Sequence, residues 1–131
     1  MERRRTRVAL AAIEAFVGIG AVYGGINLIV DAEGFGVERA WLDGSPFSSY
    51  TIPGLALLVV IGGGMLAAAA LAVRGSGLAA AAAVMMGAIT LAFLVVETLV
   101  IGYQGADQIP LVAVIGIASL ALIGLGGRTL L

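Results

Sequence analysis

Two glutamates lie inside long apolar stretches, and they are the residues of this sequence best suited to chemistry. Glu97 lies within residues 78–103 and Glu14 within residues 8–30, and each stretch is long enough to span a bilayer as a helix. An ionised acid near the centre of such a helix costs about 2.5–3.5 kcal/mol on insertion scales, whereas a neutral acid is much cheaper to bury. A glutamate in this setting is therefore expected to bind a proton or a ligand, or to hydrogen-bond a neighbouring helix.

Two sets of polar residues recur at helical spacing and define the predicted site. The first set, spaced i, i+4 and i+8 on one face of the first stretch, is Tyr23, Asn27 and Asp31. The second set, spaced i, i+7 and i+14 on the third stretch, is Thr90, Glu97 and Gln104. If the two faces meet, they form a polar pocket that binds a ligand or a proton at Glu97. The alternative interpretation is that a neutral Glu97 hydrogen-bonds Asn27 or Tyr23 and clamps two helices together.

Glu14 is a secondary candidate for proton binding. It lies about two turns inside the first stretch, close to the arginine-rich start of the chain. Its side chain is therefore expected to reach the membrane surface or to pair with Arg7 or Arg74, and its expected role is structural.

The elements that position these residues are predicted to be four transmembrane helices. The chain has 131 residues, of which 61% are hydrophobic and 11% are charged, whereas soluble domains carry about 25% charged residues. Apolar stretches cover residues 8–30, 53–73, 78–103 and 109–126, and the residues at 74–77 (RGSG) are typical of a tight turn. We therefore expect an all-α membrane protein with one domain, an antiparallel bundle of four transmembrane helices.

Charge is distributed unevenly between the two ends of the predicted bundle. Six arginines fall at one end: Arg3, Arg4, Arg5, Arg7, Arg74 and Arg128. The long connection at residues 31–52 is acidic and falls at the other end, together with Asp107. By the positive-inside rule, the N- and C-termini are expected in the cytoplasm and the long loop between the first two helices outside, in a cell (plasma) membrane.

The long loop is aromatic as well as acidic. Its Trp41, Phe47 and Tyr50 are typical of anchors in the headgroup region of a bilayer. A loop of this length is uncommon unless it is functional. It is therefore expected to cover the polar pocket in the outer half of the membrane, as a fixed roof or as a lid.

The residue types that most enzymes and metal sites use are missing. The sequence has no Cys and no His, which excludes disulfides, thiolate ligands and imidazole ligands within the chain. It contains no catalytic constellation, no metal-ligand cluster and no phosphate-binding glycine loop, and its net charge of −1 implies no general attraction to nucleic acid. No catalytic residue, metal or other cofactor is therefore predicted, and a non-enzymatic protein is expected over an enzyme.

Two segments of the chain follow a pattern found in known membrane proteins. Residues 41–54 read WLDGSPFSSYTIPG and residues 96–104 read VETLVIGYQ. They resemble the first loop and the third span of small uncharacterised prokaryotic four-span membrane proteins that are loosely DoxX-like. This resemblance implies a four-helix bundle. DoxX-like proteins are linked to quinone or thiol redox partners. Because this chain has no Cys, the resemblance does not extend to a thiol partner. Glu14 also resembles the first-span acid of small multidrug-resistance transporters, but the chain lacks their aromatic residues around that acid.

Three functions are compatible with these observations. The preferred one is a non-enzymatic accessory subunit or lipophile-binding module, whose pocket holds a lipid, a quinone or another lipophile, and which contacts membrane lipids and a second copy or a membrane-complex partner. The second is a small proton-coupled transporter that acts as a dimer, with Glu97 or Glu14 as the proton site. The third is a membrane enzyme for a lipophilic substrate, with Glu97 as acid or base and Tyr23 or Asp31 as its partner.

Overall fold

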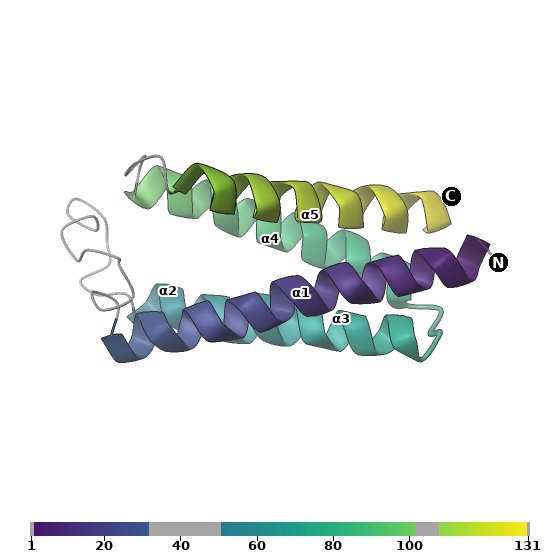
Figure 1. Ribbon diagram of the computed structural model, residues 1–131, viewed down its shortest axis with the longest axis horizontal. Helices are drawn as coiled ribbons and strands as arrows, with labels where there is room; N and C mark the ends of the chain where they lie inside the picture. Colours follow the sequence, from purple (N-terminus) through teal and green to yellow (C-terminus); the bar gives the residue numbers. More distant parts are fainter. Residues whose placement is uncertain (1, 32–50, 102–107, 131) are drawn as a thin grey trace.

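The computed structural model describes residues 2–31, 51–101 and 108–130, which are helical except for the turn at residues 74–78. The elements in order are α1 (Glu2–Asp31), α2 (Thr51–Leu55), the π-helix η2 (Ala56–Gly63), α3 (Gly64–Val73), α4 (Ala79–Ile101) and α5 (Gln108–Leu130). Because α2, η2 and α3 follow one another without a break, the chain forms four long helical spans (Figure 1). The predicted all-α fold with four long helices is confirmed.

Each of the four spans is long and apolar enough to cross a membrane. The qualifying segments are Arg4–Val30, Thr51–Val73, Ala79–Leu99 and Val112–Thr129. They agree closely with the spans predicted from hydropathy. Five of the residues singled out in the sequence lie outside the described residues: Trp41, Phe47, Tyr50, Gln104 and Asp107.

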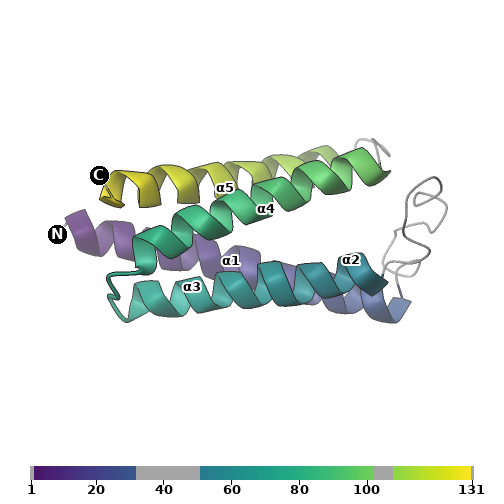
Figure 2. The same cartoon turned by 180° about the vertical axis from the view of Figure 1, so that it is seen from behind.

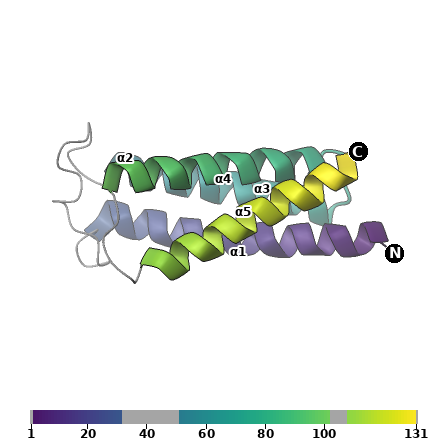
Figure 3. The ribbon, with the colours of Figure 1, turned by 90° about the horizontal axis from the view of Figure 1, so that it is seen from above.

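The four spans associate as two pairs. Helix α1 packs along α2, η2 and α3, and α4 packs along α5 (Figures 1 and 2). The start of α1, the α3–α4 turn and the end of α5 lie at the same end of the bundle, which we call the arginine end because it carries Arg7, Arg74 and Arg128. Helix α5 crosses α1 obliquely (Figure 3), and the two pairs diverge toward the opposite end.

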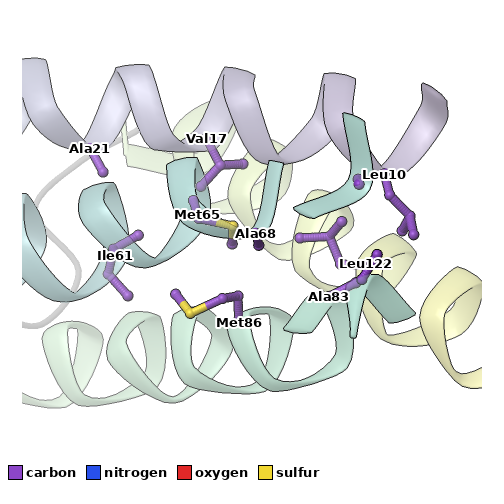
Figure 4. Packing of buried hydrophobic residues seen from close by; sticks show 11 residues of the cluster. Leu10, Val17, Ala21, Ile61, Met65, Ala68, Ala83, Met86 and Leu122 are labelled. Carbon is purple, nitrogen blue, oxygen red and sulfur yellow. The ribbon is translucent and has the colours of Figure 1, made fainter. Parts of the chain in front are cut away.

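Buried side chains join the two pairs near the arginine end. The core cluster draws on all four spans, and Figure 4 labels nine of its members: Leu10, Val17, Ala21, Ile61, Met65, Ala68, Ala83, Met86 and Leu122. In the outer parts of the spans (residues 22–30, 51–60, 91–99 and 112–118), the buried residues that the structure describes are Gly24, Gly25 and Gly54. These three glycines belong to α1 and α2, within one pair. The contact between the two pairs is therefore concentrated at the arginine end.

A glycine-containing turn joins α3 to α4, as the sequence predicts. Gly75 has a φ of 70°, a conformation that glycine adopts at little steric cost. The N–H of Ser76 donates to the Leu71 carbonyl at 3.0 Å and the N–H of Gly75 to the Ala72 carbonyl at 3.1 Å, which are the two hydrogen bonds of a Schellman motif. The Ser76 hydroxyl then accepts a hydrogen bond from the Leu78 N–H at 3.1 Å, just before α4 begins. The turn makes spans two and three an antiparallel hairpin.

The second span contains an irregular segment that the sequence does not predict. Residues Ala56–Gly63 form the π-helix η2 between two α-helical segments. Gly54, just before η2, and Gly62, near its end, both lie against α1. A Cβ atom on Gly54 would come within 2.8 Å of Ile29 Cγ1, and one on Gly62 within 2.8 Å of Val22 Cγ2. The span therefore keeps close contact with α1 through η2, and irregular turns of this kind are frequent at functional sites.

Candidate functional site

Glu14 lies inside the bundle, on the face of α1 that carries the core. Leu10 and Val17 are at i−4 and i+3, so the three side chains share one face of the helix. The Glu14 side chain is fully buried (0% exposed), and neither carboxyl oxygen has a hydrogen-bond partner in the part of the chain that the structure describes. The expectation that Glu14 reaches the surface or pairs with Arg7 or Arg74 is wrong. Glu14 lies on the face of α1 that points into the core, whereas both arginines are exposed.

The register between α1 and the second span places Glu14 in an apolar layer. A Cβ atom on Gly18 would contact Met65 and Leu66, and one on Gly25 would contact Leu58, so the two spans run antiparallel in a fixed register. One turn closer to the arginine end, Glu14 is level with residues 68–70 of α3. Residues 68 and 69 are both buried alanines, and α3 carries no polar side chain at any of its ten positions. The helix that packs against Glu14 therefore offers its carboxyl group no hydrogen-bonding side chain.

The other two described helices also leave Glu14 without a charged neighbour in the core. Between residues 79 and 96, α4 has one polar side chain, Thr90, and its single titratable group is Glu97. The titratable group of α5 is Arg128, in its last turn. A neutral carboxyl has an O–H donor and free acceptor positions, and leaving such groups unpaired in a core is unfavourable by about 1–3 kcal/mol. A buried acid without a hydrogen-bond partner is therefore a candidate functional group, for binding a proton, a ligand or a partner chain.

Two hydroxyl groups lie in the interior further from the arginine end. The Ser119 side chain is fully buried, and its hydroxyl donates to the Ile115 carbonyl of the same helix at 2.8 Å. Thr90 is 2% exposed, and its hydroxyl has no hydrogen-bond partner among the described residues. Thr90 was predicted to share a site with Glu97, and of the two described members of that set it is the one that lies in the core.

Glu97 and the polar residues Tyr23 and Asn27 of α1 are more exposed than Glu14. Glu97 is half-buried, while Tyr23 is 63% exposed and so points away from the bundle interior. The Asn27 side-chain amide donates to the Tyr23 carbonyl at 2.8 Å, within its own helix. The structure thus does not bring Tyr23 and Glu97 together in a buried pocket. Gln104 and the side chain of Asp31 lie outside the described residues, so the pocket around Glu97 stays a prediction.

The sequence shows which residues share a helix face with Glu14. Leu10, Glu14, Val17 and Ala21 follow one another at spacings of four, three and four residues, which is the periodicity of a single helix face. Depth along the helix placed Glu14 near the arginines, but the direction of the side chain around the helix axis decides its surroundings. The other faces of α1 are also largely apolar, so the spacing alone does not place this face in the core.

The described residues contain no metal-ligand group, and comparisons with known proteins give no further information about this site. Among the described residues, no group of three or more acidic residues is placed to hold a metal ion. No protein-family model matches the chain, and comparisons with curated proteins and with solved structures find no match. The resemblance to DoxX-like proteins therefore stays a prediction.

Proposed function

We propose that the chain is a multi-pass protein of the plasma membrane with both termini in the cytoplasm. The four apolar spans support a membrane location, and the grouping of Arg7, Arg74 and Arg128 at one end supports this orientation under the positive-inside rule. A reporter that is active only in the cytoplasm, fused to the C-terminus, is expected to be active. Activity from an exported-side reporter alone would reverse the orientation.

Within this membrane protein, we propose a non-enzymatic module that binds a lipophilic ligand, by itself or as an accessory subunit, through Glu14. The observation that supports this function is the full burial of the Glu14 carboxyl group with no hydrogen-bond partner among the described residues. The proposal moves the binding group from Glu97, which the sequence favoured, to Glu14.

The chemistry of the buried carboxyl defines the ligand class. A neutral acid in an apolar layer offers one strong O–H donor and a carbonyl acceptor, both unused within the described chain. A ligand with a carbonyl or hydroxyl group on an apolar body, such as a quinone or an isoprenoid alcohol, is complementary to both the acid and the apolar side chains on the same face of α1. Water-soluble ions are disfavoured, because the neighbouring helix supplies no polar side chain to replace their hydration.

Mass spectrometry of protein purified gently from native membranes tests this function. We expect one lipophile or one partner protein to be enriched with the wild-type chain and to be lost from Glu14→Leu. Glu97→Leu is the matched control, because it removes the other carboxyl in a transmembrane segment, and it is expected to keep the bound species. Recovery of the same bulk lipids from all three proteins would contradict the proposal.

A proton-coupled carrier is the second candidate, and one observation favours it specifically. Glu14 is the one titratable side chain buried in the described bundle, so a proton bound there has no competing site in the core. Exchange of that proton for a hydrophobic cation would leave the net charge of the site unchanged. In proteoliposomes, adding tetraphenylphosphonium is then expected to release protons from the wild type and from Glu97→Gln, and not from Glu14→Gln. Equal release from all three proteins would remove this candidate.

A further inference from the structure

Thr90 is a second polar side chain in the core, besides Glu14, that has no partner among the described residues. It is 2% exposed, and its hydroxyl makes no hydrogen bond there. Hydroxyls within a helix often donate to the carbonyl four residues earlier. Three hydroxyls of the described helices do so: Thr98 to Leu94 at 2.8 Å, Ser119 to Ile115 at 2.8 Å and Thr129 to Leu125 at 3.0 Å. Thr90 does not bond the carbonyl of Met86 in this way, so its O–H is available to another molecule.

The second span offers Thr90 no polar side chain. A Cβ atom on Gly64 would lie 2.6 Å from Met86 Sδ, and the two spans are antiparallel, so Thr90, one turn beyond Met86, is level with η2. None of the eight residues of η2 has a polar side chain. The polar side chain that α5 buries, Ser119, uses its hydroxyl within its own helix. Thr90 therefore lies in an apolar layer, as Glu14 does.

Glu14 and Thr90 lie at different depths of the interface between the two helix pairs. Gly18 lies against Met65, and Met86 lies against the residue just before Met65, so Gly18 and Met86 are at about the same level. Glu14 is one turn from Gly18 toward the arginine end, and Thr90 is one turn from Met86 toward the opposite end. Four residues on each helix, at about 1.5 Å per residue, separate the two polar groups by about 12 Å along the bundle.

Two flexible side chains lie between these two levels. Met65 and Met86 are both buried and come from opposite helix pairs (Figure 4). Methionine is unbranched and adaptable, and it is common at surfaces that accept varied apolar ligands. The interior between Glu14 and Thr90 is therefore the part of the core best suited to yield to a narrow apolar molecule.

We propose that Thr90 is a second binding residue for the lipophile that Glu14 binds, and that this ligand has a polar group near each end of an elongated apolar body. The inference rests on the proposed function of Glu14 and adds the length and polarity of the ligand. The Glu14 carboxyl hydrogen-bonds one end, the Thr90 hydroxyl donates to an oxygen at the other, and the apolar body lies beside Met65 and Met86. A ligand with one polar end leaves the Thr90 hydroxyl unpaired, so it binds more weakly.

Two isomeric ten-carbon diols test the inference through thermal stabilisation of the full-length protein in detergent. The α,ω-diol has a hydroxyl at each end, and its isomer has both hydroxyls at one end, so the two have the same atoms. We expect the wild type to bind the α,ω-diol about tenfold more tightly in apparent Kd, because only this isomer reaches both Glu14 and Thr90.

Variants of Thr90 assign this preference to its hydroxyl. Thr90→Val has nearly the same shape without the hydroxyl and is expected to remove the preference for the α,ω-diol, whereas Thr90→Ser is expected to keep it. The matched control is Ser119→Ala, which removes a buried hydroxyl that is already bonded within its own helix. This control is expected to keep the preference of the wild type.

The outcomes distinguish this inference from the proposed function. If Glu14→Leu no longer responds to either diol while Thr90→Val keeps the preference, Glu14 binds the ligand and the role given to Thr90 is wrong. If Glu14→Leu responds to both diols as the wild type does, the proposed function fails and the inference fails with it. Equal binding of the two isomers by the wild type would overturn the inference, even if Thr90→Val does not fold.

Discussion

Replacing Glu14 by leucine is expected to stabilise the isolated bundle by about 1–3 kcal/mol in the free energy of unfolding, measured in detergent by thermal or denaturant titration. The carboxyl group is fully buried and has no hydrogen-bond partner among the described residues, so folding removes it from water without compensation. Leucine has a similar volume, carries no polar atom and matches Leu10 and Val17 on the same face of α1.

The control for this change is Glu97→Leu, since Glu97 is half-buried and loses less hydration when the chain folds. A smaller change in stability is expected there. A Glu14→Leu protein that is less stable than the wild type would mean that the carboxyl is paired in the purified protein, with a ligand or a second chain. If Glu14 is functional, the variant should be more stable than the ligand-free wild type and should no longer be stabilised by the bound species, which is the usual trade-off at binding sites.

Replacing Gly25 by alanine is expected to destabilise the bundle by about 1–3 kcal/mol, because it forces α1 away from the second span. A Cβ atom on Gly25 would lie 2.8 Å from the Gly54 carbonyl oxygen, 2.8 Å from the Leu58 amide nitrogen and 2.8 Å from Leu58 Cβ. Two of these three atoms belong to the backbone, so no change of rotamer relieves the clash. The measurement is the unfolding free energy of the purified variant, beside the wild type.

Gly20→Ala is the matched control for Gly25→Ala, on the same helix and with the same change of side chain. A Cβ atom on Gly20 meets nothing within 4 Å, so little change in stability is expected. Equal destabilisation by the two substitutions would show that the loss comes from the helix itself and not from the α1–α2 contact. The pair therefore measures the close approach of the two spans directly.

The number and extent of the spans could be predicted because each span depends on the summed hydropathy of its own consecutive residues. An apolar stretch of about 20 residues is visible in composition alone, whichever way its side chains point. The turn at residues 74–77 is also local, since Gly75 supplies a backbone conformation that other residues avoid. These features need no knowledge of which helices touch.

The inward face of each helix could not be predicted in the same way. The spans are apolar almost all round, so burial of hydrophobic surface does not choose one orientation over another, and packing of small residues decides it. Tyr23 and Glu97 were expected to face each other from their spacing, yet Tyr23 points outward and the polar group in the core is Glu14. A pocket between the helix ends at the arginine end was equally hidden, because residues more than 100 positions apart in the chain, such as Thr6 and Arg128, line it together.

Because buried side chains join the two helix pairs in one part of the bundle only, a rotation at that part changes the distance between the pairs elsewhere. The two helix pairs are joined near the α3–α4 turn, and in the outer parts of the described spans the buried residues are glycines within the α1–α2 contact. The outer part of α4 that the structure describes, residues 91–99, is nine residues long, which at about 1.5 Å per residue makes a lever of about 14 Å. A rotation of about 10° at the inner end of this segment then moves its outer end by about 2 Å. Packing at one end of the bundle therefore controls the separation of the helix pairs at the other.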